Sequence, residues 1–294
     1  MRYTLRQLEV FLAVARSESV SRAADELGMS QSAVSGALAD LERQFDIRLF
    51  DRIGKRLQLS ALGRSLRPRG DALQDQARAL EHAFAKQNEI GLLRVGATLT
   101  IGNHVAVPLM AEFMRAYPGS RVQLEVANTL EISRKVHNFE IDVGLVEGEL
   151  NDPALRVTRW RNDELVVFAA PGHAYAKKEA LDDDDLLATR WIVREPGSGT
   201  RQAFEHAMHG LLPDLEIALE LQHTEAIKSA VEAGLGLGCV SRIAVAEAFR
   251  HGTLVPLNVP HRNFRRQFFF VLHEEKYQSS GLQNWMELCA RSGE

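Results

Sequence analysis

The sequence predicts an α/β protein with a small helical unit at its N-terminus, one long helix after it, and a larger domain of alternating strands and helices. Three short amphipathic helix patterns lie between Thr4 and Phe45. A single helical pattern then continues from Ser60 through about 28 residues. Beyond Gly91, short apolar runs alternate with helical patterns, which is typical of a mainly parallel sheet. A chain of 294 residues is long enough for two or more units with separate cores.

The first three patterns predict a helix-turn-helix. TLRQLEVFLAVAR and SVSRAADELG carry apolar residues at helical spacing, and Gly28 ends the second helix. QSAVSGALADLERQF forms the third helix after a short turn. Its predicted outer face has small polar residues that suit the DNA major groove, where a glutamine can pair with an adenine edge. The predicted contacts are Gln31, Ser32, Ser35 and Gly36. A merely solvated helix face is the alternative for each.

The stretch IRLFDRIGKRLQLS, directly after the third helix, reads as a hairpin with a basic tip. Such a wing suits a phosphate backbone or a minor groove, so Arg52, Lys55 and Arg56 are predicted DNA contacts. The charge distribution agrees with this prediction. The net charge is -4, but residues 1–70 carry 12 Lys or Arg against 8 Asp or Glu, which makes this part of the chain basic.

The long helical pattern from Ser60 has an apolar seam. Ser60 can cap its start, and Pro68 falls within it or kinks it. A lone amphipathic helix between domains has no second face of its own chain to cover its seam, so pairing with a second copy is expected. The seam consists of Leu62, Leu66, Leu73, Ala77, Leu80 and Phe84.

The α/β region brings polar residues to the ends of predicted strands, where ligands bind in such sheets. The stretch REPGSGTRQAFEHAM places a glycine-rich turn before a helix, which is an anion site by virtue of its N–H groups and helix dipole. It lacks the lysine of a phosphate-binding Walker loop. Helix capping alone is the alternative for each threonine. The predicted effector-binding residues are Thr98, Thr100, Glu147, Ser198, Gly199, Thr200, Arg201 and Thr224.

Other functions receive less support. Cys239 and Cys289 are too few for a disulfide framework or a zinc site, so buried thiols are expected. His206 and His209 are three residues apart but have no supporting ligands, so neither a metal nor a cofactor is expected. An α/β transferase or hydrolase using Ser198 or Cys239 is the enzyme alternative, although no nucleophile elbow is present. The sequence has no apolar run near the roughly 20 residues of a membrane span, and a cytoplasmic protein is expected.

The run from Leu5 to Gly63, with FLAVARSESVSRAADELGMSQSAVSGALADLE, LFDR and LSALG in register, resembles the winged helix-turn-helix of the LysR-type transcriptional regulators. The resemblance implies a winged helix-turn-helix DNA-binding domain at 1–60, a linker and dimerisation helix at 61–90, and an effector-binding domain at 91–294. That domain would have two lobes of the periplasmic-binding-protein type. Lobe I would span about 91–160 and 266–294, and lobe II about 161–265. Gly36 departs from the family, which often has a long polar or basic side chain there.

EPGSGTR and TEAIKSAVEAGLGLG resemble the branch of this family that controls sulfur and carbon assimilation. That resemblance implies a regulator, not an enzyme, whose effector is a small oxyanion such as sulfite or sulfate, or an anionic metabolite. The expected partners are promoter or operator DNA as a double strand, the anionic effector, a second copy in a homodimer or homotetramer, and RNA polymerase.

Overall fold

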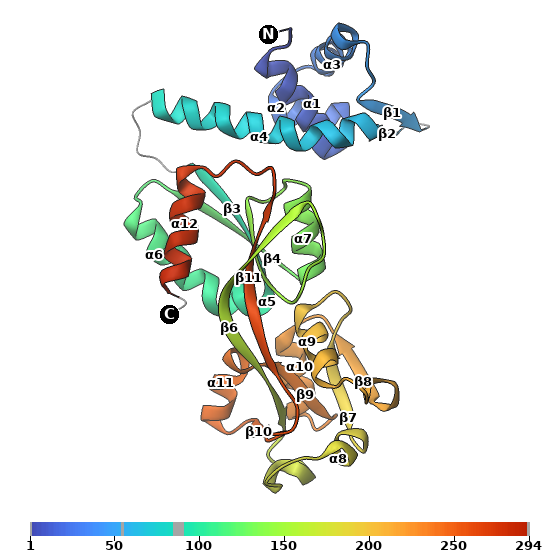
Figure 1. Cartoon of the computed structure of the whole chain (residues 1–294), viewed down its shortest axis with the longest axis vertical. Helices are drawn as coiled ribbons and strands as arrows, with labels where there is room; N and C mark the ends of the chain where they lie inside the picture. The colour runs from blue at the N-terminus through green and yellow to red at the C-terminus, as the bar shows by residue number, and fades with distance from the viewer. Residues whose placement is uncertain (1, 54–55, 85–90, 293–294) are drawn as a thin grey trace. The chain divides into compact units, whose positions relative to one another are not determined.

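The computed structural model describes residues 2–53, 56–84 and 91–292 (Figure 1). The chain divides into two compact units. Unit 1 comprises Met1–Asn88 together with Glu275–Ser279, and unit 2 comprises Glu89–Glu274 together with Ser280–Glu294. Each unit has its own hydrophobic core.

Unit 1 begins with three helices whose ends are set by local capping. They are α1 (Leu5–Ser17), α2 (Val20–Leu27) and α3 (Gln31–Phe45). The side chains of Thr4, Ser19 and Ser30 each accept a hydrogen bond from the first turn of the helix that follows. Gly28 ends α2 in the left-handed conformation, at φ 62°. These short-range signals produce the helix-turn-helix that the sequence predicts.

A two-stranded wing follows α3. Strands β1 (Phe50–Ile53) and β2 (Arg56–Leu59) pair antiparallel, with Phe50 opposite Leu59. The Glu42 carboxylate accepts hydrogen bonds from the backbone N–H groups of Leu49 and Phe50, at 2.6 and 3.3 Å. The start of the wing is therefore fixed to α3.

The long helix α4 (Ala61–Phe84) packs partly on its own unit. Leu66 and Leu73 contact the core of α1–α3, and a side chain at Gly70 would approach Leu8 and Leu12 to 3.2 Å. The expectation that this seam needs a second copy is therefore wrong for Leu66 and Leu73. Leu80 is different, because 54% of it is exposed.

Unit 1 also includes the segment 275–279, and the Lys276 ammonium lies 2.6 Å from the Asp75 carboxylate of α4. Ser60 starts α4 as predicted, since its hydroxyl accepts from the Gly63 N–H at 3.0 Å. Pro68 is accommodated within the helix.

Unit 2 is built on a sheet that has nine strands in the described residues. Its main path runs β4-β3-β5-β11-β6-β9-β7-β8, and β10 pairs with β6. The pairs β3–β4, β3–β5, β7–β8 and β7–β9 are parallel. The strands are β3 (Leu92–Thr98), β4 (Arg121–Ala127), β5 (Val143–Glu147), β6 (Leu155–Ala169), β7 (Arg190–Arg194), β8 (Glu216–Leu221), β9 (Leu237–Ser241), β10 (Val255–Leu257) and β11 (Arg265–His273).

The helices of unit 2 connect these strands and divide it into two lobes. The first lobe contains α5 (Leu99–Ile101), a π-helical turn (Gly102–Ala106), α6 (Val107–Ala116), α7 (Thr129–His137) and α12 (Ser280–Arg291). The second contains α8 (Asp183–Leu187), α9 (Gly199–Ala207), α10 (Thr224–Glu232) and α11 (Arg242–His251), with short 3-10 turns at Ala174–Lys177 and Leu212–Asp214. Phe113 and Trp285 pack in the first lobe, and Trp191 and Phe204 in the second.

Strands β6 and β11 run antiparallel through both lobes (Figure 1). They pair from Arg265 opposite Glu164 to His273 opposite Leu155. Residues 156–162 of β6 are not fully buried and form no apolar run, so an apolar pattern marks only the second half of this strand. Pairing with β11 extends the strand. The predicted lobe boundaries fall within β6 and at the start of β11.

None of the helices in the described residues is both long enough and apolar enough to cross a membrane.

Candidate functional site

The outer face of α3 is exposed to solvent. Val34, Leu38 and Leu41 are buried against the other helices, which turns the opposite side of α3 to solvent. The predicted contacts on that side, Gln31, Ser32, Ser35 and Gly36, are all exposed. A side chain built at Gly36 would meet no atom within 4 Å, so this stretch of the helix surface is open.

The wing carries the other predicted DNA contacts. The backbones of Arg52 and Arg56 lie in β1 and β2, directly opposite Leu57 and Ile53. Their side chains, and the whole of Lys55, lie outside the described residues.

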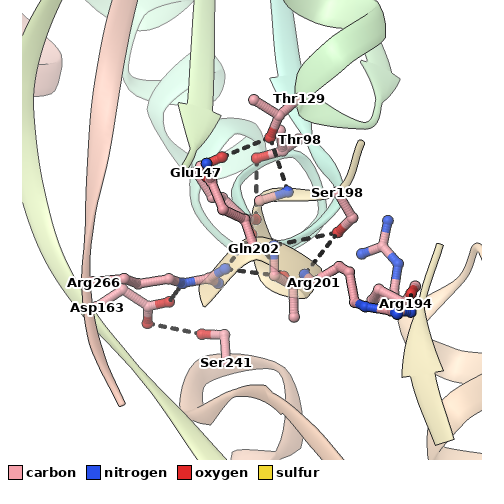
Figure 2. A network of polar contacts seen from close by, with 12 residues as sticks. Thr98, Thr129, Glu147, Asp163, Arg194, Ser198, Arg201, Gln202, Ser241 and Arg266 are labelled. Carbon is pink, nitrogen blue, oxygen red and sulfur yellow. Dashed lines mark hydrogen bonds and ion pairs between the residues drawn. The ribbon is translucent and has the colours of Figure 1, made fainter. Parts of the chain in front are cut away.

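A buried group of polar side chains connects the two lobes of unit 2 (Figure 2). We call it the inter-lobe cluster and define it as Thr98, Thr100, Glu147, Asp163, Thr200 and Arg266, none of which is more than 9% exposed. The first three come from the first lobe, Thr200 comes from α9 of the second, and Asp163 and Arg266 lie opposite each other on β6 and β11.

The Glu147 carboxylate is the acceptor at the centre of this cluster. The hydroxyls of Thr98 and Thr200 donate to its two oxygens at 3.0 and 2.8 Å, and Arg266 Nη1 lies 2.5 Å from Oε2. Burial raises the pKa of Glu147, but the Arg266 guanidinium and the hydroxyls of Thr100, Thr200 and Thr98 together bring it below its ordinary value. Glu147 is therefore an ionised carboxylate at neutral pH.

Arg266 is the cation of the cluster, and it is not among the residues predicted from the sequence. Its Nε donates to Asp163 at 2.7 Å, and the Ser241 hydroxyl donates to the other oxygen of Asp163 at 2.8 Å. Arg266 Nη1 also donates to the Thr200 hydroxyl at 2.9 Å. Arg266 Nη2 is buried and has no hydrogen-bond partner among the described residues. The only sequence signal for this role was a charged residue at the start of an otherwise apolar strand.

The glycine-rich turn that precedes α9 makes a close contact between the lobes. The Gly199 N–H donates to the Thr129 hydroxyl at 3.2 Å, and that hydroxyl donates to the Glu147 carbonyl at 2.6 Å. A Cβ atom at Gly199 would lie 1.8 Å from the Glu147 carbonyl oxygen, so only glycine fits there. Gly197 adopts φ 84°, which also favours glycine.

The N–H groups of this turn are already satisfied. The Ser198 hydroxyl caps α9 by accepting from the N–H groups of Thr200 and Arg201, at 3.2 and 3.5 Å. Gly199 is engaged by Thr129. The N–H groups of Gly199, Thr200 and Arg201, which were predicted to cradle an anion, thus have intramolecular acceptors in this structure.

Arg201, the predicted charge partner for an anion, points away from the cluster and toward Arg194 (Figure 2). Its guanidinium donates to Glu205 at 2.6 Å, to Glu220 at 3.1 Å and to the Arg194 carbonyl at 3.0 Å. The structure thus assigns Arg201 to the second lobe's own ion pairs.

Thr224 is buried at the first residue of α10. The neighbouring Gln222 and His223 line a separate cavity of about 490 Å³. Its other lining residues are Leu99, Asn103, Val126, Ala127, Asn128, Glu131 and Glu195, so it faces both lobes.

The residues of the enzyme alternative do not form a catalytic arrangement. Ser198 is the α9 cap, and burial raises the pKa of the Cys239 thiol well above its ordinary value, which disfavours the nucleophilic thiolate. Cys239 and Cys289 are both buried free thiols. Within residues 2–53, 56–84 and 91–292, no group of His, Cys, Asp and Glu is arranged to hold a metal ion.

Comparisons with known proteins give matches along the whole chain. Residues 5–64 match the bacterial regulatory helix-turn-helix protein of the lysR family, and residues 86–294 match the LysR substrate binding domain. The HTH-type transcriptional regulator YeiE of Escherichia coli (strain K12) is 40% identical over 98% of both chains.

Two solved structures are also similar. A full-length OxyR variant from Pseudomonas aeruginosa has a TM-score of 0.78 at 19% identity and covers 98% of this chain and 94% of its own. The Synechocystis CcmR regulatory domain in complex with 2-PG has a TM-score of 0.65 at 27% identity and covers 69% of this chain and 98% of its own.

Proposed function

Because the chain belongs to the LysR family of transcriptional regulators, we propose that it reads an operator through α3 and the wing, and that it responds to a small oxyanion such as sulfite or sulfate bound at the inter-lobe cluster. Its two halves are a DNA-binding helix-turn-helix and an effector-binding domain, and the family consists of regulators, not enzymes. The operator contacts and the effector are the parts that we propose.

The exposed face of α3 supports the operator contacts. Gln31 can form a bidentate pair with an adenine edge, and the small Ser32, Ser35 and Gly36 allow the helix to enter the major groove closely. Basic residues of the wing contribute phosphate contacts, which carry affinity but little sequence preference.

DNA binding by variants tests this division of roles. Gln31→Ala should relax the preference at one base pair by roughly 1–3 kcal/mol. Lys55→Ala with Arg56→Ala should instead weaken binding to all sequences and reduce its salt dependence. Both are measured by fluorescence anisotropy with operator and scrambled duplexes over a range of salt concentrations. Unchanged binding by all of these variants would contradict the proposal.

One observation carries the effector proposal: three threonine hydroxyls and one guanidinium converge on a carboxylate at the boundary between the lobes. Hydroxyl and guanidinium donors arranged around anionic oxygens are the donor set that an oxyanion requires. Arg266 supplies the charge that the sequence analysis assigned to Arg201. Opening the lobes would separate Thr200 from Glu147 and expose these donors.

The choice of a small oxyanion rests on resemblance and on size. EPGSGTR and TEAIKSAVEAGLGLG resemble the sulfur and carbon assimilation branch of the family. The CcmR domain was solved with 2-PG, so a similar domain holds a small ligand. A larger carboxylate or phosphorylated metabolite is the rival, and the cavity of about 490 Å³ beside His223 is large enough for one.

Calorimetric titration of the full chain with sulfite, sulfate, phosphate and small carboxylates tests the effector proposal. Thr100→Val and Thr200→Val each remove a hydroxyl donor and should weaken oxyanion binding by about 1 kcal/mol or more. Thr253→Val, which alters an exposed threonine outside the cluster, is the matched control and should bind as the wild type does. The proposal fails if none of the oxyanions binds the wild type, or if both cluster variants bind as tightly.

We also propose that the chain acts as a homodimer or homotetramer joined through α4, and that RNA polymerase is a partner at the promoter. The exposed Leu80 on α4 supports the first of these proposals.

A further inference from the structure

The inter-lobe cluster has more negative than positive charge. Glu147 and Asp163 are two buried carboxylates, and Arg266 is the guanidinium that contacts both of them. The formal charge of this group is therefore −1. A dianion brought to it would face both carboxylates in a buried site, where unpaired charge is strongly unfavourable. Binding of a dianion at this cluster is therefore unfavourable, although the hydrogen-bond donors of the cluster suit oxyanion oxygens.

The hydroxyl of Thr200 shows what kind of group fits between Glu147 and Arg266. It donates to the Glu147 carboxylate at 2.8 Å and accepts from Arg266 Nη1 at 2.9 Å. A ligand atom that lay beside this hydroxyl and contacted both Glu147 and Arg266 would likewise have to donate one hydrogen bond and accept another. An oxygen of a fully deprotonated anion accepts only.

Arg266 offers one further donor. Its Nη2 is buried without a hydrogen-bond partner among the described residues, while Arg266 as a whole is 8% exposed. A buried N–H without an acceptor costs free energy, which a ligand oxygen beside it would recover. A ligand that contacted both groups would therefore offer an acceptor oxygen to Arg266 and an O–H to Glu147.

From these contacts we propose that the cluster binds its oxyanion in a protonated, monoanionic form, with the ligand's O–H donating to Glu147 and its other oxygens accepting from Arg266. This inference rests on the proposed function. For sulfite chemistry, the bound species is hydrogensulfite and not the sulfite dianion. Of the two oxyanions named in the proposed function, sulfite is kept and sulfate is excluded, because sulfate is a dianion without a proton at neutral pH and has no O–H to donate to Glu147.

The pH dependence of binding to the full chain tests this proposal. Sulfite is titrated by calorimetry at several pH values on both sides of its second ionisation, with sulfate and nitrate as probes that carry no proton. Sulfite affinity should fall about tenfold per pH unit above that ionisation, because only the protonated fraction binds. Sulfate and nitrate should bind at least tenfold more weakly than sulfite at the acidic end of the range.

Glu147→Gln separates the carboxylate's role from a general effect of pH on the protein. An amide can donate to a deprotonated oxygen, so this variant should lose most of the pH dependence and gain affinity for sulfate relative to sulfite. Glu149→Gln is the matched control: Glu149 is exposed, lies two residues away, and should keep the wild-type pH profile. If Glu147→Gln does not fold, the titrations of the wild type with sulfite and sulfate still test the proposal.

The failures are distinguishable. If sulfite binds at no pH, the proposed function falls and this inference falls with it. If sulfate binds as tightly as sulfite, or if sulfite affinity is constant or rises with pH, the inference is overturned while oxyanion binding survives.

Discussion

At the scale of single residues, Arg266 holds the two lobes' buried carboxylates together. It lies within 2.5 Å of Glu147 and 2.7 Å of Asp163, and its side chain is almost fully buried. Arg266→Met should therefore leave two buried carboxylates without a cation and destabilise unit 2 by about 3–5 kcal/mol at neutral pH. Arg265→Met, which alters the exposed neighbour on β11, should cost little.

The cost of Arg266→Met should depend on pH. In the wild type the pKa of Glu147 is lowered, so its stabilising contribution is present above the unfolded pKa and is lost as pH falls through the folded pKa. Without Arg266, burial would raise the pKa of Glu147 above its unfolded value, and the resulting penalty would be relieved as pH falls. Urea denaturation at neutral and acidic pH should show that the unfolding free energies of wild type and Arg266→Met converge as the pH falls. A difference in unfolding free energy between the two proteins that is constant with pH would contradict this account.

At the scale of single elements, α4 has two functions along its length. Leu66 and Leu73 stabilise its own unit by packing on the helix-turn-helix, whereas Leu80 is half-exposed and free for a partner. A substitution at Leu73 therefore cannot test self-association, because it would disturb the fold of unit 1.

Leu80→Asp is the informative change on α4. It should weaken self-association by roughly tenfold or more, since an unpaired carboxylate in an apolar contact costs at least about 2 kcal/mol. Sedimentation velocity over a range of concentrations measures the shift toward monomer. Gln76→Asp places the same charge at an exposed polar position of α4 and should leave the oligomer unchanged. The same oligomer for Leu80→Asp and wild type would show that α4 does not join the copies.

At the scale of the whole molecule, the effector must bind with different affinity to the DNA-bound and free forms if it is to regulate, because only differential affinity shifts a population. β11, which carries Arg266, ends at His273, close in sequence to the 275–279 segment of unit 1.

Thermodynamic reciprocity makes this coupling measurable. If sulfite changes operator affinity by some factor, the operator should change sulfite affinity by the same factor, typically about 5- to 150-fold. The comparison is calorimetric titration of sulfite into the protein with and without operator duplex, beside operator titrations with and without sulfite. A scrambled duplex should change sulfite affinity less. Unequal factors in the two directions would show that the measured sulfite site is not the regulatory one.

The sequence alone determined the features of this protein that depend on nearby residues. The three N-terminal helices, the end of the second helix at Gly28, and the exposed Gln31 and Ser35 followed from periodicity and capping within a few residues. The same holds for the alternation of strands and helices beyond Gly91. Helix periodicity also brought Leu66 and Leu73 to one face, but it did not say what would cover that face.

Only the tertiary structure decided which side chains meet at the inter-lobe cluster. Arg266 contacts Asp163 across 103 residues and Glu147 across 119, and no local pattern marks such pairs. Arg201 was the nearer cation in sequence to the glycine turn, yet Glu205 and Glu220 engage it instead. Gly199 allows a close approach of the Glu147 backbone, which is 52 residues away in the sequence. The physical reason is that a buried charge is placed by the partners that compensate it, and the pairing of β11 with both β6 and β5 brings those partners together.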